Sequence, residues 1–239
     1  MVVIGMGFTV TYNGITDKSM GCHAKSRPSV PAPVQKVKVS ELAGRDGGYY
    51  DAESVYSDIS IPVTFSFRQQ NKLLWHQTYR AIKSWLLSGD NGDLKFSDDV
   101  GYHYRVKNVQ INSTDRIAWT IGEVTATFIC DGYTYLDSGD TQINLAARIQ
   151  NDYALCMPIY DITGNGAFTL TVNSRNMTGT VSTNLTIDTE RMLAIQNGST
   201  WVNTTVTGDY QDLWLKPGLN LLSITSGMTC KIKPQWRCL

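Results

Sequence analysis

The sequence predicts a mainly β fold, a β-sandwich or barrel with one packed α-helix, followed by a second all-β domain. Its 239 residues suffice for one large domain or two of ordinary size. The chain is rich in Thr, Val, Ile, Tyr, Trp, Asn and Gly, a composition typical of pleated sheets joined by tight turns. A long helical pattern free of Pro and Gly occurs once, over residues 71–88.

The first domain, predicted to span residues 1–136, is organised around a strand, the helix and further strands. Apolar residues occupy every second position of Ile59–Phe67, the pattern of a strand with one buried face. After the helix, strand-like segments at 94–96 and 102–111 lead to a turn predicted at 112–115. Nearer the start of the chain, Asn13-Gly14 predicts a tight hairpin.

The helix has one apolar and one basic side. Asn71 is a suitable N-cap and Gly89 a suitable C′ residue. At about 100° per residue, the side opposite the apolar arc carries Lys72, His76, Arg80 and Lys83, with leucines at its two ends, Leu73 and Leu87. Isolated exposed leucines are ordinary, but leucines flanking basic residues also suit a subunit contact. The pattern leaves both interpretations open.

The loop Gly44–Asp51 is a second candidate contact region. It follows a strand marked by Val37 and Val39 and holds an arginine and two tyrosines, Arg45, Tyr49 and Tyr50. Exposed aromatic residues on a polar loop suit a contact arm for a partner. A solvated loop with incidental tyrosines explains the same residues equally well.

The second half of the chain predicts strands and turns without a helix. Hydrophobic periodicity fades after Cys130 and returns at Leu155, which predicts a linker over 137–155 and a second domain over 156–239. Short strands at regular spacing favour a β-sandwich or a jelly roll. We expect turns at Gly164–Gly166 and at Pro217-Gly218, and a β-bulge at Gly122 in the first domain.

Motifs for catalysis, cofactors and metals are missing from the sequence. It has no Walker loop and no nucleophile elbow, and the pair Cys22-His23 lacks partners at zinc-ligand spacing. Asp188 and Glu190 are interpreted as turn residues in preference to calcium or sugar ligands. We therefore expect no enzyme, with no catalytic residues, metal or cofactor. One alternative remains, a carbohydrate-binding β-sandwich for host-surface adhesion, with Trp201 or Trp214 as a stacking platform.

Charge and hydropathy narrow the choice of partners. Lys plus Arg equals Asp plus Glu at 21 each, which argues against specific nucleic-acid binding through a basic face. No apolar run approaches the roughly 18 residues that span a bilayer, and the first residues lack the basic region of a signal peptide. Five scattered cysteines fit reduced thiols in a protein assembled in a cytoplasm.

An ordered set of segments resembles the distal tail protein family of long-tailed phages with non-contractile tails. The first domain contributes the Gly44–Gly47 loop, the strand at 59–67, a helix ending Ile82-Lys-Ser-Trp-Leu86, Leu94-Lys-Phe-Ser-Asp98 and the strand 102–109. The second half contributes Ile187–Glu190 and Leu215–Leu222, which are similar to segments of that family's galectin-like C-terminal domain, and the chain closes on Lys233–Arg237.

This resemblance implies a structural virion protein. Family members form a hexameric ring at the tail tip through the N-terminal domain and are assembled in the bacterial host cytoplasm. One face of the ring meets the tail tube protein, and the other meets the tail-associated fibre or lysin protein. The galectin-like domains point outward and, in many phages, carry receptor-binding or baseplate proteins. The ring lumen passes DNA without base-specific contacts.

Overall fold

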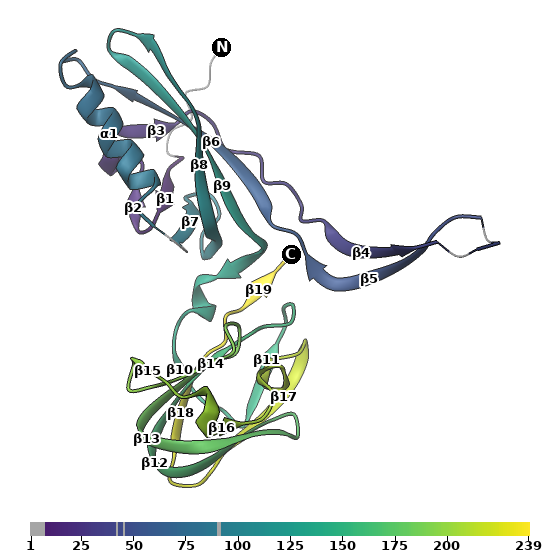
Figure 1. Cartoon of the computed structure of the whole chain (residues 1–239). Helices are drawn as coiled ribbons and strands as arrows, with labels where there is room; N and C mark the ends of the chain where they lie inside the picture. The colour runs from purple at the N-terminus through teal and green to yellow at the C-terminus, as the bar shows by residue number, and fades with distance from the viewer. Residues whose placement is uncertain (1–7, 42, 45, 90–91) are drawn as a thin grey trace. The chain divides into compact units, whose positions relative to one another are not determined.

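The computed structural model describes residues 8–41, 43–44, 46–89 and 92–239, and the chain divides into two compact units between residues 134 and 135. Figure 1 shows the elements of both units. The predicted linker, residues 137–155, belongs to the second unit and contains short elements, η2 (Asp137–Gly139), β10 (Ile143–Asn144) and β11 (Arg148–Asn151). The hydrophobic pattern did not predict β11, because one of the two side chains that this strand buries is an asparagine, Asn151.

The main sheet of unit 1 confirms the prediction of a mainly β domain. Its strands run in the order β2 (Ile15–Thr16), β1 (Val10–Tyr12), β7 (Gly92–Phe96), β8 (Tyr102–Ala118), β9 (Ile121–Leu136), β6 (Ile59–Arg68) and β3 (Cys22–Ala24). β1 and β2 form the predicted hairpin, because Tyr12 pairs with Ile15 and both turn residues, Asn13 and Gly14, have positive φ. A short 3₁₀ helix, η1 (Lys18–Met20), precedes β3.

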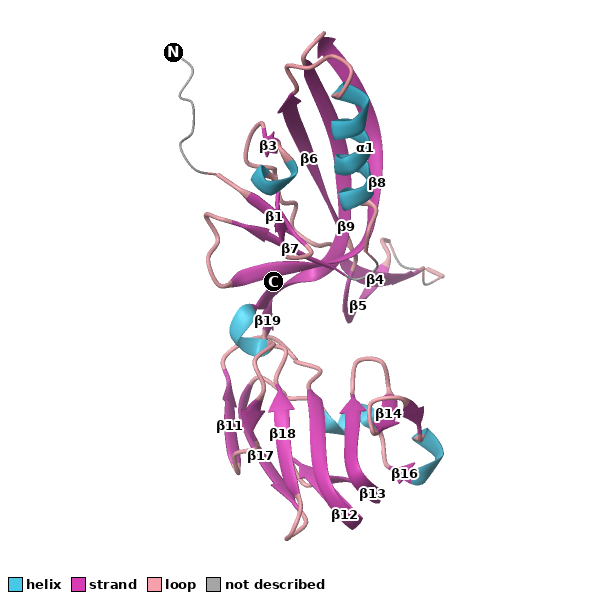
Figure 2. Cartoon of the chain, turned by 90° about the vertical axis from the view of Figure 1, so that its left-hand side faces the viewer, coloured by secondary structure: helices cyan, strands magenta, loops and turns pink. Residues whose placement is uncertain are grey.

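The single α-helix of the described residues, α1 (Trp75–Leu86), packs on the face of the sheet that β6 presents (Figure 2). Alternate residues of β6 are buried, as the sequence predicts. Trp85 of the helix meets the ring of Phe65 at 5.5 Å between ring centroids, and Trp75 meets Phe67 at 5.3 Å. These aromatic pairs hold the apolar side of α1 on the strand.

Both predicted helix ends are wrong. The helix starts four residues after Asn71, because the Asn71 side chain accepts a hydrogen bond from the Leu73 N–H in a separate turn. At the other end the helix stops at Leu86, and Gly89 does not adopt the left-handed conformation of a C′ residue. Its lack of a side chain serves packing instead, because a Cβ there would lie 2.1 Å from the Asn13 amide nitrogen.

The turn predicted at 112–115 and the bulge predicted at Gly122 are also absent from the fold. β8 continues to Ala118, and the chain reverses at Trp119 and Thr120. The end of β8 nearest the hairpin turn is solvated and carries polar residues, and such residues are also typical of turns, which explains the wrong prediction. Gly122 pairs with Phe67 in an unbroken register between β6 and β9. A Cβ at Gly122 would lie 2.3 Å from the Phe67 ring, so glycine is required there for space.

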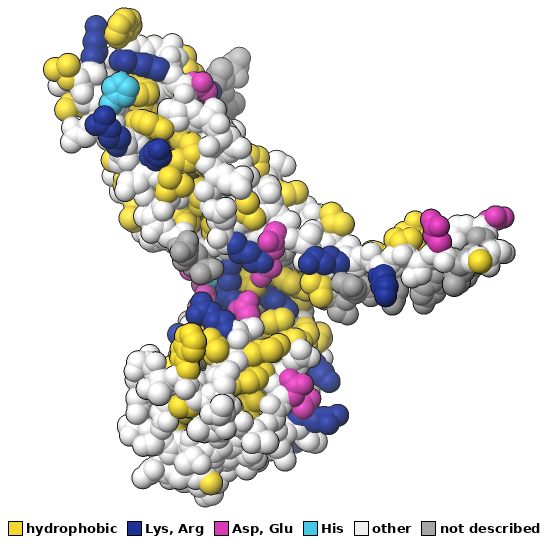
Figure 3. Space-filling model, in the orientation of Figure 1, with side chains coloured by type: hydrophobic (Ala, Val, Ile, Leu, Met, Phe, Trp, Pro, Cys, Tyr) yellow, Lys and Arg dark blue, Asp and Glu magenta, His cyan; other side chains and the backbone are white. Residues whose placement is uncertain are grey.

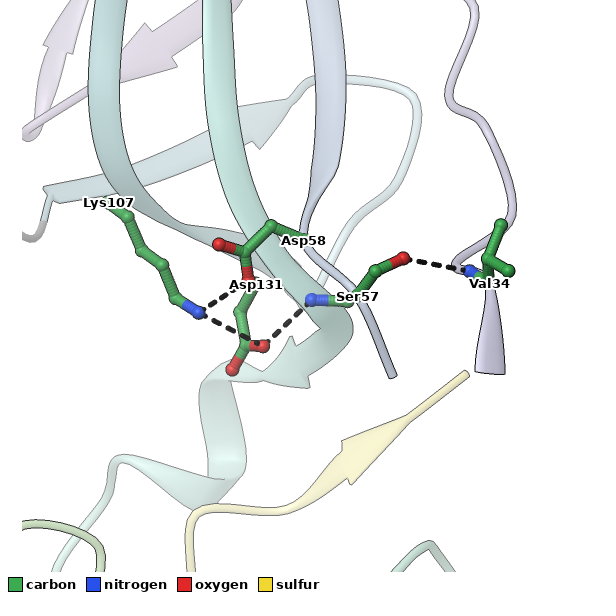
Figure 4. A network of polar contacts seen from close by, with 6 residues as sticks. Val34, Ser57, Asp58, Lys107 and Asp131 are labelled. Atoms are coloured by element: carbon green, nitrogen blue, oxygen red, sulfur yellow. Dashed lines mark hydrogen bonds and ion pairs between the residues drawn. The ribbon is translucent and has the colours of Figure 1, made fainter. Parts of the chain in front are cut away.

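β4 (Gln35–Ser40) and β5 (Tyr49–Tyr56) form a two-stranded ribbon separate from the main sheet. A polar network joins its base to β8 and β9 of the main sheet (Figure 4). The Ser57 N–H donates to the Val34 carbonyl at 2.9 Å. Lys107 on β8 contacts the carboxylates of Asp58 at 2.6 Å and Asp131 at 3.7 Å. Although burial lowers the pKa of Lys107, the hydrogen bond to Asp58 and the charge of Asp131 raise it overall, so Lys107 stays cationic.

Unit 2 is all β, as predicted. One sheet runs in the order β10, β18 (Thr229–Lys233), β12 (Ile159–Val172), β13 (Arg175–Asp188), β14 (Leu193–Gln196) and β15 (Thr200–Trp201), with β16 (Val206–Thr207) paired to β13. β17 (Gly218–Ile224) pairs with β11 and β12, and the remaining short elements are η3 (Asn203–Thr205), η4 (Tyr210–Leu213) and β19 (Arg237–Cys238). The core lies between these layers and includes Tyr160, Ile162, Leu170 and Leu185.

Two predicted turns of unit 2 have different outcomes. The turn expected at Gly164–Gly166 is wrong, because β12 runs through both glycines in continuous pairing with β13. The turn at Pro217-Gly218 is present, with Gly218 at φ +97°. Buried Asn220 holds this turn: its amide donates to the carbonyls of Lys216 and Gly218, and its oxygen accepts from the Lys216 N–H.

Candidate functional site

The outer side of α1 carries the basic residues that the sequence places there. Lys72, just before the helix, and His76, Arg80 and Lys83 within it are all exposed. Figure 3 shows basic side chains beside hydrophobic ones over this part of unit 1. The sequence between residues 71 and 89 contains no acidic residue, so the positive charges are not neutralised within the segment. Leu73 is 88% exposed and Leu87 is also exposed, which leaves apolar surface at both ends of the charged strip.

The tip of the β8–β9 hairpin extends this surface with residues that sequence reasoning did not select. The Arg116 guanidinium lies between two indoles, 4.9 Å from the ring centre of Trp75 and 5.2 Å from that of Trp119. Its Nη2 also donates to the Trp119 carbonyl at 2.8 Å. The Lys72 ammonium lies 5.0 Å from the Trp119 ring centre. Alternating cations and indoles therefore tie the hairpin tip to the start of α1.

We call this combined surface the basic helix face, comprising Lys72, Leu73, His76, Arg80, Lys83, Leu87, Arg116, Ile117 and Trp119. Trp119 is 69% exposed and Ile117 is exposed beside it. A shallow groove between α1 and β8 adjoins the face and is lined by Tyr79, Lys83, Leu87 and residues 111–114. Trp119 lies in the turn between β8 and β9, a position that the sequence pattern did not single out.

The residues predicted for the contact loop lie on the ribbon, a separate element of unit 1. Arg45 lies outside the described residues. Tyr49 begins β5 and pairs with Ser40. Tyr50 is 68% exposed and pairs with Val39, another exposed residue. The contact roles of the loop and of the helix residues stay predictions, on two different elements of the same unit.

Other titratable residues have structural roles. Asp188 accepts hydrogen bonds from the backbone N–H groups of Glu190 and Arg191, which is the turn role expected from the sequence. Cys22 is buried while His23 is exposed, because adjacent strand residues point to opposite sides. Burial is the main cause that raises the pKa of Cys22 to about 12, and it does the same for Cys130 and Cys230. These thiols are therefore protonated and inert at neutral pH.

The two tryptophans considered for sugar stacking differ in exposure. Trp214 is half-buried, and its indole N–H donates to the Thr189 carbonyl at 3.3 Å. Trp201 on β15 is 74% exposed. None of the described helices has the length and apolar character needed to cross a lipid bilayer.

A helix-backed sheet with an exposed basic and aromatic face, followed by an all-β unit, is the architecture of a modular β protein with large contact surfaces. Residues 21–130 match the family described as the phage tail protein RIFT-related domain. A comparison with curated proteins finds no significant match.

Solved structures resemble the chain over nearly its whole length. The Dit protein of phage SPP1, described as a paradigm of the hub adsorption apparatus in phages that infect Gram-positive bacteria, has a TM-score of 0.68 at 15% identity. The match covers 98% of this chain and all of that one. A chain of the phage p2 baseplate in its activated conformation with calcium has a TM-score of 0.57 at 10% identity, over 98% of this chain and 99% of its own. The predicted resemblance to distal tail proteins is thereby confirmed, and the chain has the fold of the SPP1 hub protein.

Proposed function

We propose that the chain is a structural virion protein at the distal end of a long non-contractile phage tail. There it forms a hexameric hub ring that joins the tail tube to the tail-associated fibre or lysin protein and to receptor-binding or baseplate proteins. The phage tail domain at residues 21–130 and the fold shared with the SPP1 hub protein support this role. The role requires surfaces for assembly and no catalysis.

The basic helix face is the observation that carries the proposal. A closed ring needs a heterologous interface, in which one surface of a subunit meets a different surface of its neighbour. Exposed Trp119 and Leu73 supply apolar anchors, and the surrounding lysines and arginines supply steering charge. A stable interface buries roughly 800 Å² on each partner, more than one helix side provides. The hairpin tip widens the face beyond α1.

The ribbon is suited to the complementary role of an arm. It pairs only with itself among the described strands, and its valines and Tyr50 are exposed in the single chain. The network at its base, built on Lys107, limits how the arm can swing. We assign the ribbon to a subunit or tail-protein contact that covers its apolar side chains, since extended edges of this kind accept partners readily.

Native mass spectrometry of the purified full chain at micromolar concentration tests the ring. We expect a hexamer of about 160 kDa, six times the 26.6 kDa subunit. A chain that stays monomeric, alone and after addition of tail tube protein, contradicts the proposal.

Charge reversal tests the assignment of the face. The double variant Arg80→Glu/Lys83→Glu changes two exposed residues of α1 and should shift the population from hexamer to monomer, more strongly at low than at high salt. Arg175→Glu, which reverses an exposed cation of unit 2 that lies 3.9 Å from Asp212, is the control and should leave the mass unchanged. A hexamer that is insensitive to the double variant would move the interface away from α1.

A further inference from the structure

Trp201 is an exposed indole on a firmly held strand of unit 2. Its strand, β15, is fixed to β14 by the Asn203 side chain, whose oxygen accepts from the Ala194 N–H at 2.8 Å and whose nitrogen donates to the Met192 carbonyl at 2.9 Å. The Val202 N–H donates to the Ala194 carbonyl at 2.8 Å as well. The indole is therefore presented to solvent by a strand that hydrogen bonds hold in place, and it offers a flat apolar ring face with a polar N–H at its edge.

The strand register places a row of side chains beside Trp201 on the outer face of the sheet. Trp201 pairs with Ile195 across β14, and Ile195 pairs with Thr186 across β13. Thr186 pairs with Asp161 on β12, which pairs with Lys231 on β18. The neighbours of Asp161 on β12, Tyr160 and Ile162, are buried, so the row lies on the solvent side.

The polar end of the row is ordered around the Asp161 carboxylate. One oxygen accepts from the Thr186 hydroxyl and the other from the Gln142 amide, each at 2.5 Å. Each oxygen keeps lone pairs that can accept further hydrogen bonds. Lys231 lies next in the row and adds a donor. The group therefore offers a carboxylate held in place by two hydrogen bonds and a neighbouring lysine donor, groups of the kind that recognise hydroxyls.

The spacing of the row sets the size of its ligand. Trp201 and Asp161 are three strands apart, about 14 Å at the usual spacing of 4.8 Å between strands. Ile195 and Thr186 lie between them, and their side chains are shorter than the indole. Trp201 therefore projects further from the sheet than the residues beside it in the row. An extended ligand with an apolar ring face at one end and hydroxyl groups further along fits this arrangement.

The charges of the outer face favour an uncharged ligand. Asp161 and Asp188 point outward from β12 and β13, and Lys231 and Lys233 point outward from β18. Opposite charges are interspersed, so the face has no strong field of one sign that would select a polyanion. Sugars combine ring faces that stack on tryptophan with hydroxyl groups that bind carboxylates and ammonium groups.

We infer that the outer face of unit 2 binds a short neutral linear oligosaccharide of about three rings, with the ring at one end stacked on Trp201 and the ring at the other end hydrogen-bonded by Asp161, Thr186 and Lys231. This activity is independent of ring formation. It would give the chain a direct contact with a glycan surface in addition to a scaffold role.

Titration calorimetry of the full chain with a panel of trisaccharides tests the inference. The panel contains neutral β-1,4-glucose, α-1,4-glucose and β-1,4-N-acetylglucosamine trisaccharides, with trigalacturonate as the charged probe. We expect millimolar or tighter binding of at least one neutral trisaccharide and weaker binding of trigalacturonate. Absence of binding by every neutral probe at 10 mM overturns the inference.

Variants locate the site. Trp201→Ala should weaken binding at least tenfold, and Asp161→Asn several-fold, because the amide cannot accept from both of its present donors. Leu219→Ala, which removes another exposed apolar side chain of unit 2, is the matched control and should leave affinity unchanged. Equal melting temperatures check that the variants are folded. Binding that survives Trp201→Ala overturns the assignment, whatever the oligomeric mass of the chain.

Discussion

β6 and β4 share one sequence pattern and have opposite burial. In β6, Ile61 and Phe65 alternate with polar residues and are fully buried. In β4, Val37 and Val39 alternate with lysines, yet Val39 is 54% exposed. The difference is the second layer: α1 covers β6, whereas β4 and β5 pair with no other strand in the part of the chain that the structure describes. Alternation identifies a strand, and only a packing partner makes one of its faces a core.

The comparison also clarifies how the chain can assemble. Folding of the single chain buries the apolar face of β6, so that face stabilises the fold and is not accessible to a partner. The apolar side chains of the ribbon remain in water and are available to another surface. Substitutions in the two strands should therefore affect different measurements.

The largest expected effect is on the core strand. Phe65→Ala removes a fully buried ring that contacts Trp85 and should lower the free energy of unfolding of unit 1 by about 3–5 kcal/mol. Val39→Ala in the ribbon should change it by less than about 0.5 kcal/mol. Urea denaturation followed by tryptophan fluorescence compares them. Similar losses in both variants would show that the ribbon is covered in the single chain.

A pair of glycines gives the next largest contrast. Gly122→Ala on β9 brings a methyl group within 2.3 Å of the Phe67 ring and 2.8 Å of Trp75, and overpacking of this kind costs about 1–3 kcal/mol. Gly48→Ala at the ribbon comes closest to the exposed Val39 side chain, at 2.9 Å, which can move away. Thermal unfolding should therefore show a clear decrease for the first variant and almost none for the second.

Thiol chemistry distinguishes the cores from the ribbon. Because burial raises the pKa of Cys22, Cys130 and Cys230 to about 12 from an ordinary value of 9.0, their stabilising effect is complete below pH 9. It is lost as the pH rises from 9 toward 12, so the urea midpoint should decrease over that range.

Alkylation with iodoacetamide at pH 8 is the companion measurement. In a Cys238→Ser background the buried thiols should stay unmodified for as long as the protein is folded, whereas an added Val39→Cys in the ribbon should react rapidly. Fast modification of Cys130 in folded protein would contradict the assigned burial.

The smallest effect is expected at the base of the ribbon. Lys107→Met removes contacts to Asp58 and Asp131, but the lysine is about half exposed, so the loss of stability should be about 0.5–1 kcal/mol and smaller at high salt. Its effect on the arm should be more visible: amide exchange at the base of β4 and β5 should accelerate. Unchanged exchange there would mean that the hydrogen bonds between Val34 and Ser57 fix the ribbon alone.

The two exposed tryptophans show where sequence reasoning stops. Trp119 and Trp201 are both exposed, and the residues next to them in the sequence do not distinguish an exposed indole from a buried one. Trp119 lies at a hairpin turn where Arg116 and Lys72 cover its ring faces in part. Trp201 lies on an edge strand at the end of a polar row. Each environment is created by strands that are distant in sequence, so no local pattern encodes it.

The sequence by itself determined the local properties of this protein: the mainly β class, the strand at 59–67, the hairpin at Asn13-Gly14, and the basic side of the helix. These follow from periodicity, turn chemistry and residue type, which act over a few positions. Tertiary structure alone decided the helix ends, the role of Gly122, the inclusion of residues 137–155 in unit 2, and the joining of Arg116 and Trp119 to α1. The physical reason is that burial and close approach depend on which surfaces meet, and those surfaces come from segments far apart in the chain.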